Sequence, residues 1–378
     1  MTANLPVYLD YNATAPIRPE AAAAVARALE VGGNPSSVHA AGRAARNLVE
    51  TARAQVAALV GSSSRAVTFV SGGAESNALA IESAAAAGYE EILVGATEHD
   101  TVRASAAAAG VEVAEWPVGP DGVADLDWLD ARLAAGRKSL VCLMLANNET
   151  GVVQPVAEAA RRVREAGGWL HVDAIQGAGK LAIDFEALGA DTLSLSAHKL
   201  GGPQGVGALV AGPRARLSRR IHGGGQERGL RAGTENVSGI AGFGAAAEAA
   251  SRDLPRAAVE SAGRDELEKV VLAAGAEVLG QGAPRLPQTL CFAMPAFASE
   301  LQIIGLDLAG VMVSAGAACS SGKVKASHVV TAMGRPDLAA CAIRVSGGWA
   351  TTPDDWARCA QAWSQIHARH AARQKEFA

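Results

Sequence analysis

The sequence predicts an α/β fold in which helices cover a mostly parallel central sheet of seven strands. Three observations support this prediction. Between about residues 20 and 250, short apolar runs alternate with longer helical stretches. The apolar runs are roughly three to six residues long, which is typical of buried strands. Finally, 49% of the 378 residues are hydrophobic but only 4% are aromatic, because alanine-rich stretches that favour helices supply much of the apolar content.

The predicted elements follow one another in a regular order. Apolar runs predict strands at residues 67–70, 92–94, 111–114, 140–145, 169–172, 192–195 and 206–210. The stretches between them predict helices at residues 19–29, 40–60, 75–87, 125–135 and 156–166. After about residue 254 several prolines interrupt this pattern, which predicts a second, smaller α/β domain. The carboxyl ends of parallel strands meet at one edge of a sheet, so residues directly after each strand are the first candidates for a ligand site.

Charge and cysteine content exclude several classes of protein. The net charge of −4 gives no electrostatic reason to expect a nucleic-acid or anionic-membrane partner. The sequence contains no apolar window of membrane-spanning length and no targeting pattern at its start, so we expect a cytoplasmic protein. The five cysteines form no C-x-x-C pair and have no neighbouring histidine at metal-ligand spacing. We therefore expect neither a disulfide framework nor a metal site.

Polar residues follow several of the predicted strands. Ser71-Gly72-Gly73 precedes a helix, so its backbone N–H groups favour an anion, although an ordinary strand-to-helix turn has the same pattern. Asp173 ends an apolar run and needs a partner there: a protonated pyridine nitrogen, an arginine or a helix cap. Lys199 follows another run, where an interior amine becomes nucleophilic, whereas most lysines are simply solvated. Together these three features are the parts of a pyridoxal phosphate site.

A series of segments then points to a known family. In chain order they lie at residues 8–16, 33–39, 97–100, 147–151, 171–176, 196–199, 222–228 and 231–234. These segments together resemble those of NifS/IscS-type cysteine desulfurases, which are class V aminotransferases and pyridoxal phosphate-dependent transferases of fold type I. The resemblance extends from about residue 7 to 350. It implies a large cofactor-binding domain at residues 14–250 and a small domain, formed by residues 1–13 and 251–378, that carries a catalytic cysteine.

The resemblance implies a role at the cofactor ring for five residues. Lys199 holds pyridoxal phosphate covalently and later moves the substrate's α-proton. Asp173 keeps the pyridine nitrogen protonated, and Gln176 forms a hydrogen bond with the ring's phenolic oxygen. His99 stacks on the ring face, and Asn148 lies close to the cofactor and the substrate.

Further matching residues concern the phosphate group and the substrate. The resemblance implies that the phosphate is bound by Ser196, His198 and the Gly73-Ala74 turn, together with Thr234 from the other subunit of a homodimer. It also implies that Arg344 binds the carboxylate of the substrate L-cysteine with help from Asn34. For Arg344 a surface ion pair is the alternative.

Cys319 lies in a segment rich in small residues, from position 314 to 322. The nearby Lys323 and Lys325 favour the thiolate form of Cys319. The alternative is that Cys319 is a structural cysteine, which packs in the core like any small apolar residue. The resemblance implies that Cys319 attacks the substrate's sulfur and becomes a persulfide while alanine is released. An iron–sulfur scaffold protein is then the expected sulfur acceptor.

The chain departs from many relatives at three positions: Ala74 replaces a threonine, Ala197 a glycine and Trp349 an arginine. Two other functions remain open. One is a selenocysteine lyase or another fold-type I enzyme that acts on a different amino acid. The other is an inactive scaffold that binds iron–sulfur assembly proteins, which the presence of Lys199 and Cys319 argues against.

Overall fold

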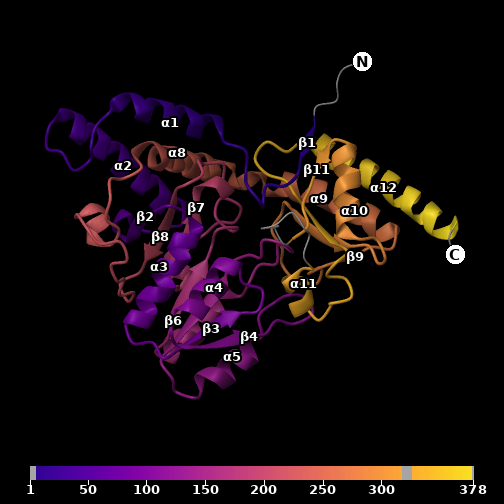
Figure 1. The fold of residues 1–378 in the computed structure, drawn as a ribbon, viewed down its shortest axis with the longest axis horizontal. Helices are drawn as coiled ribbons and strands as arrows, with labels where there is room; N and C mark the ends of the chain where they lie inside the picture. Colours follow the sequence, from indigo (N-terminus) through magenta and orange to yellow (C-terminus); the bar gives the residue numbers. More distant parts are fainter. Residues whose placement is uncertain (1–5, 317–325, 377–378) are drawn as a thin grey trace.

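A seven-stranded sheet forms the centre of the computed structural model, which describes residues 6–316 and 326–376 (Figure 1). Its strand order is β2-β8-β7-β6-β5-β3-β4. β8 runs in the direction opposite to the other six strands. The carboxyl ends of the other strands therefore lie at one edge. The bounds are β2 (Val67–Val70), β3 (Glu91–Gly95), β4 (Glu112–Trp116), β5 (Ser139–Met144), β6 (Trp169–Asp173), β7 (Thr192–Ser196) and β8 (Gly207–Ala211).

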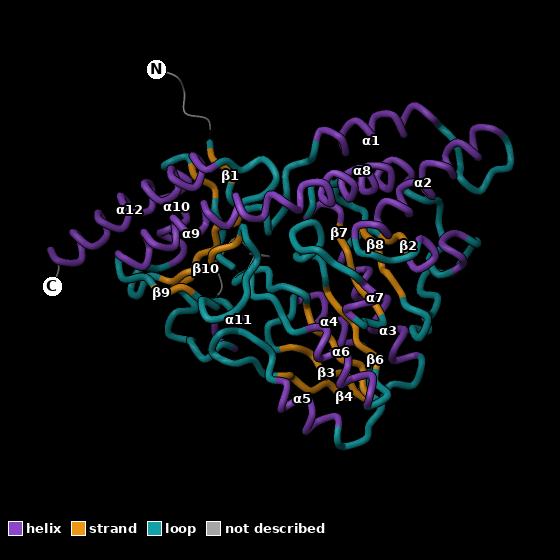
Figure 2. The backbone as a smooth tube through the Cα atoms, turned by 180° about the vertical axis from the view of Figure 1, so that it is seen from behind, coloured by secondary structure: helices purple, strands orange, loops and turns teal. Residues whose placement is uncertain are grey.

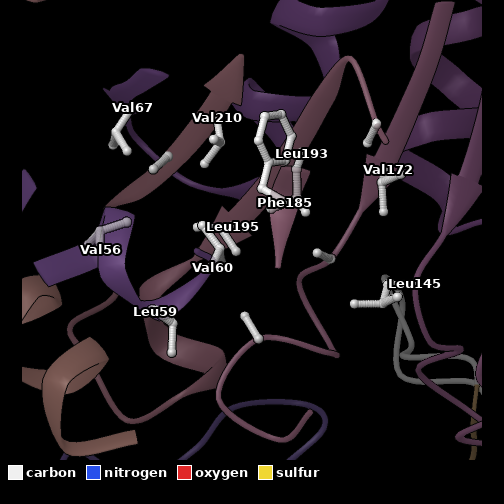
Figure 3. Close-up of a cluster of buried hydrophobic side chains, with 14 of the residues drawn as sticks. Val56, Leu59, Val60, Val67, Leu145, Val172, Phe185, Leu193, Leu195 and Val210 are labelled. Atoms are coloured by element: carbon white, nitrogen blue, oxygen red, sulfur yellow. The ribbon is translucent and has the colours of Figure 1, made fainter. Parts of the chain in front are cut away.

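Helices pack on both faces of this sheet because successive strand residues point to opposite sides. Leu93 and Val141 join the larger buried cluster with residues of α2, α6 and α8, part of which Figure 3 shows. Ile92 and Leu140 pack instead with residues of α3 and α4. The bounds are α1 (Pro19–Val31), α2 (Ala40–Leu59), α3 (Gly73–Ala86), α4 (Asp100–Ala108), α5 (Leu126–Leu133), α6 (Val156–Glu165), α7 (Phe185–Leu188) and α8 (Val237–Asp253).

A second region contains two small sheets and four helices and lies at the opposite end from the α1–α2 loop (Figure 2). The antiparallel sheet β12-β10-β9 lies beside the parallel pair β1-β11, so the start of the chain joins residues near its end. The bounds are β1 (Val7–Tyr8), β9 (Glu277–Val278), β10 (Thr289–Ala293), β11 (Val311–Met312), β12 (Ala342–Ser346), α9 (Ala257–Ala273), α10 (Ser299–Leu308), α11 (His328–Ala332) and α12 (Pro353–Glu376).

The structure confirms the predicted α/β fold. Each predicted strand and helix is present, with its ends within two residues of the expected positions. Around the large sheet the helices α4, α7 and α8 were not predicted, and in the second region no individual helix or strand was predicted. None of the described helices is long and apolar enough to cross a lipid bilayer.

Candidate active site

The carboxyl ends of neighbouring strands assemble the candidate site. β6 ends at Asp173, and β7 ends at Ser196 and continues into a 3-10 turn that contains Lys199. β2 leads through Gly72 into α3, and β3 leads to His99 at the start of α4. The sheet topology thus brings these predicted residues to one edge.

Asp173 carries a buried carboxylate without an ionic partner among the described residues. Its side chain is held instead by neutral donors. Asn77 Nδ2 donates to Oδ2 at 2.9 Å, and the backbone N–H of Ile175 donates to Oδ1 at 3.0 Å. Burial raises the pKa of Asp173, while these hydrogen bonds and the nearby His99 and Lys199 oppose the increase. A cation placed against this carboxylate would offset the cost of its burial.

A chain of buried groups behind Asp173 fixes the orientation of its carboxylate. Because Asn77 Nδ2 donates to Asp173, its Oδ1 is left to accept from His171 Nε2, 3.1 Å away. Burial lowers the pKa of His171 to about 3, so the ring is neutral. Its Nδ1 then accepts from the Thr192 hydroxyl at 3.0 Å, which assigns the tautomer from the hydrogen-bond pattern.

Sequence reasoning did not single out Asn77 and His171, although each carries a positional signal. Asn77 lies about one turn after the Gly73 start of α3. His171 lies two residues before Asp173 and therefore on the same face of β6.

The amine of Lys199 lies against two backbone carbonyls from the start of the chain. Nζ donates to the oxygens of Asn12 and Ala13 at 2.6 and 2.7 Å. Burial and, to a lesser extent, the positive charge of Arg344 lower the pKa of Lys199 to about 8, against the opposing effect of Asp10 and Asp173. The environment thus brings a usable fraction of neutral, nucleophilic amine close to neutral pH.

Asn12 and Lys180 complete the surroundings of Gln176 and were also missed from the sequence. Gln176 Nε2 donates at 2.8 Å to the Asn12 oxygen that also accepts from Lys199. Lys180 Nζ donates at 2.7 Å to Gln176 Oε1, which fixes the direction of the amide. Burial lowers the pKa of Lys180 to about 7. No local pattern indicates Asn12, because its contacts come from segments more than 100 residues away.

His99 caps α4 through its own ring. Nδ1 accepts from the backbone N–H of Thr101 at 3.1 Å, so Nε2 carries the ring proton in the neutral form. The Thr101 hydroxyl, in turn, accepts from Asn77 Nδ2 at 3.0 Å. The exposed His99 ring is thereby linked to the network that holds Asp173.

The Gly72-Gly73 turn forms a cradle of unbonded backbone N–H groups. As in any helix, the first N–H groups of α3 lack intrahelical acceptors. No side chain caps α3, so these groups have no cap acceptor either. Strand β8 packs close beneath the turn, since a Cβ on Gly207 would lie 2.7 Å from the carbonyl carbon of Gly72. A Cβ on Gly73 would lie 3.7 Å from that of Ser196, so these two predicted residues are neighbours.

His198 lies beside the start of the chain, where Nδ1 is 3.2 Å from the Thr14 hydroxyl. Burial, together with the nearby charges of Lys199 and Lys180, lowers the pKa of His198 to about 4, so its imidazole is neutral at pH 7.

Arg344 is buried in β12 and is not the surface ion pair that the sequence left open. Nη2 pairs with Asp10 Oδ1 at 2.6 Å, and Nη1 donates to the backbone oxygen of Asn148 at 3.0 Å. Its Nε has no partner among the described residues. Arg344 and Asn148 are therefore neighbours, and the Nε–H of Arg344 is free to donate.

Two predicted residues form no contact with this assembly. Thr234 and Asn34 are exposed in loops before α8 and after α1, and no contact joins them to Lys199 or Asp173. Cys319 lies outside the described residues. Of the departures from the family pattern, Ala74 is exposed and Ala197 is buried.

The residues present fit pyridoxal phosphate on three counts. Asp173 has no ionic partner among the described residues, and a protonated pyridine nitrogen would be such a partner. The cradle before α3 offers N–H groups at the positive end of a helix, which suits a phosphate group. Lys199 offers a buried amine with a lowered pKa.

Comparison with known proteins agrees with this chemistry. Residues 7–358 match the aminotransferase class-V family. A cysteine desulfurase of Cereibacter sphaeroides is 44% identical over 360 residues, which cover 92% of each chain. The cysteine desulfurase IscS of Dictyoglomus turgidum is 39% identical over 92% of this chain and 91% of its own. The X-ray structure of a NifS-like protein from Rickettsia africae has a TM-score of 0.89 at 33% identity, covering 96% of this chain and 99% of that one. These matches confirm the resemblance inferred from the sequence segments, and the chain belongs to the aminotransferase class-V family.

Proposed function

We propose that this protein is a cysteine desulfurase that converts L-cysteine to L-alanine and transfers the sulfur to an acceptor through Cys319. The observation that carries the proposal is the buried carboxylate of Asp173, which lacks an ionic partner among the described residues and lies at the same sheet edge as the buried amine of Lys199. The similarity to proteins named cysteine desulfurases supports the choice of substrate.

Pyridoxal phosphate is the cofactor in this proposal. Lys199 would hold it covalently, Asp173 would pair with the ring nitrogen, Gln176 would donate to the phenolic oxygen, and His99 would contact the ring face. The phosphate would be bound by Ser196, His198 and the N–H groups of Gly73 and Ala74. When bound, this cofactor supplies an electron sink for the bond broken at the substrate's Cα.

The protein's own residues perform the remaining chemistry. Arg344 binds the substrate carboxylate, with Asn148 beside it and Asn34 assisting. Lys199 takes the proton from Cα and later returns a proton to the substrate. The Cys319 thiolate attacks the substrate's sulfur, so a sulfur–sulfur bond forms while the carbon–sulfur bond breaks. The pair of electrons left on carbon is protonated, which yields alanine and a Cys319 persulfide with no external oxidant.

We also propose a homodimer and a protein acceptor. Asn34 and Thr234 are exposed and form no hydrogen bond with Lys199 or Asp173, as expected of groups that serve a partner subunit's site. The acceptor in this proposal is an iron–sulfur scaffold protein. The four described cysteines are free thiols, which suits a reducing compartment, so we place the reaction in the cytoplasm.

Mass spectrometry of the protein after incubation with L-cysteine tests this proposal. We expect one additional sulfur atom on the peptide that contains Cys319, together with one alanine released. Cys319→Ala should keep the cofactor's absorbance and lose sulfide production, whereas Lys199→Ala should lose both. Unchanged sulfide release by Cys319→Ala would refute the proposal, and activity with selenocysteine alone would favour a selenocysteine lyase.

A further inference from the structure

Glu149 contacts the chain on both sides of residues 317–325, at Gly316 and at Ser327. Its side chain is only 2% exposed, and it follows Asn148 in the turn after β5. The Ser327 hydroxyl donates to Glu149 Oε2 at 2.5 Å. A Cβ on Gly316 would lie 2.0 Å from this same oxygen, so the carboxylate packs directly on the Gly316 backbone. The chain therefore leaves and re-enters the described region against one carboxylate oxygen.

The turn that carries Glu149 is itself held firmly. Asn147 Oδ1 accepts from the backbone N–H groups of both Glu149 and Thr150, each at 2.9 Å. Asn147 Nδ2 donates to the oxygen of Thr97 at 3.1 Å. The backbone of Glu149 is thus fixed to the segments that follow β5 and β3.

Ser327 is held from two sides. Its oxygen accepts from the N–H of Val330 at 3.1 Å, which caps α11, while its hydroxyl proton points to Glu149. The next residue, His328, forms a 3.2 Å hydrogen bond through Nε2 with the backbone oxygen of Glu98, beside His99. The returning chain is therefore joined to the segment that carries the ring-facing histidine.

The departing chain is joined to the substrate side. Two residues before Gly316, Ser314 exchanges backbone hydrogen bonds with Arg344, at 2.6 and 3.2 Å. Cys319 follows Gly316 by three residues, so covalent geometry keeps its Cα within about 11 Å of the Gly316 Cα. The position of Gly316 thus limits where the thiol can reach.

We propose that Glu149 is a positioning residue, which by holding Gly316 and Ser327 sets the point from which Cys319 reaches the substrate's sulfur. The proposal rests on the proposed function. Glu149 acts through these two neighbours and not on the substrate. Replacing Ser327 by alanine removes its hydrogen bond to Glu149 together with the cap that its oxygen provides for α11.

Single-turnover persulfide formation on Cys319 of the holoenzyme tests this role. We expect Ser327→Ala and Glu149→Asp to slow it by about 10- to 100-fold, since small displacements of a reacting group have effects of this size. Ser327→Thr, which keeps the hydroxyl, should restore most of the rate. The absorbance change on adding L-cysteine, which reports substrate binding at the cofactor, should keep its rate and amplitude in all three variants.

A double-mutant cycle and a matched control make the test specific. Combining Ser327→Ala with Glu149→Asp should cost little more than either change alone, because each breaks the same hydrogen bond between Ser327 and Glu149. Thr331→Val is the control, since it removes a hydroxyl that bonds the Ser327 carbonyl oxygen without touching Glu149. The positioning role is overturned if persulfide formation is unchanged in Ser327→Ala, if the two effects add fully, or if the absorbance change slows in parallel. Sulfide release by Cys319→Ala would instead overturn the proposed function.

Discussion

The charges around Lys199 determine when its amine is reactive. Two carbonyl oxygens orient Nζ, while burial and the nearby Arg344 guanidinium disfavour the ammonium form. The pKa of Lys199 is therefore about 8, below its ordinary value of 10.5, so the neutral amine predominates above about pH 8.

This pKa predicts the pH dependence of cofactor attachment to the apoprotein. The rate, followed by absorbance after mixing with pyridoxal phosphate, should rise with pH and level off above about pH 8. Arg344→Gln removes a positive charge and should move the midpoint to higher pH, whereas Arg344→Lys should leave it nearly in place. An unchanged midpoint in Arg344→Gln would contradict this account.

Asn77 supports the Asp173 carboxylate, and its removal should weaken cofactor binding. Asn77→Ala leaves Oδ2 of Asp173 without its donor, so we expect about a tenfold increase in the dissociation constant for pyridoxal phosphate. Absorbance titration of the apoprotein measures it. Ser76→Ala, on the same helix as Asn77, is the matched control, because the Ser76 hydroxyl donates to the backbone oxygen of Ala208 in β8 and does not touch Asp173. Equal binding by both variants would rule out the role of Asn77.

Residues on strand ends could be predicted from the sequence, whereas their supports could not. Asp173 and Lys199 each follow a recognisable apolar run. Asn12 contacts Gln176, Lys199 and Thr289, which are 164 to 277 residues away in the sequence. Only the folded topology brings these groups together.

At the scale of elements, the close approach of β8 to the start of α3 shapes the cradle of N–H groups. A Cβ on Gly207 would meet backbone atoms of Gly72 and Leu195, which cannot move without moving the cradle. A Cβ on Gly73 would meet mainly Cδ1 of Ile175, at 2.2 Å, which is the flexible end of a side chain.

These two clashes predict different outcomes for two small substitutions. Gly207→Ala should lower the free energy of unfolding by about 1–3 kcal/mol and weaken phosphate binding. Gly73→Ala should be rescued by adding Ile175→Val, whereas the same addition should not rescue Gly207→Ala. Denaturant unfolding and inorganic phosphate binding by the apoprotein measure both effects. Rescue of Gly207→Ala by Ile175→Val would show that the backbone contact is not limiting.

Most helices and strands around the large sheet could be located from local sequence patterns, but some form only because of their tertiary contacts. Most of the seven strands could be predicted because they are short, buried runs rich in apolar residues between polar turns, although β4 contains Glu112 and Glu115. α8 contains Gly242 and Gly244, which weaken any helix prediction. In the fold, a Cβ on these residues would lie 2.6 Å from Val25 and Ala52, so the glycines allow α8 to pack against α1 and α2. The sequence alone does not reveal that packing.

At the scale of the whole molecule, the proposed homodimer predicts that defective subunits complement each other. Lys199→Ala should give an inactive homodimer, and Thr234→Ala should give a weakly active one. A mixed dimer should regain up to half of the normal activity, because one of its two sites receives Lys199 from one subunit and Thr234 from the other.

Co-expression of the two variants with different affinity tags gives the mixed dimer for assay, and light scattering gives its mass. Two Lys199→Ala subunits with different tags serve as the control and should stay inactive. A monomer with full activity, or a mixed dimer with no gain, would contradict the shared site.

The pairing of β1 with β11 has a consequence for how the molecule is made. Val7 pairs with Val311, and Asn12 and Ala13 hold the Lys199 amine just beyond this strand. A ribosome adds roughly 5–20 residues per second, so the first strand waits some tens of seconds for its partner. Lys199 is synthesised partway through this wait, and until Val311 follows it lacks the carbonyl oxygens that orient it. The nascent chain therefore carries its reactive lysine through the synthesis of about 110 further residues before the site that tunes it exists.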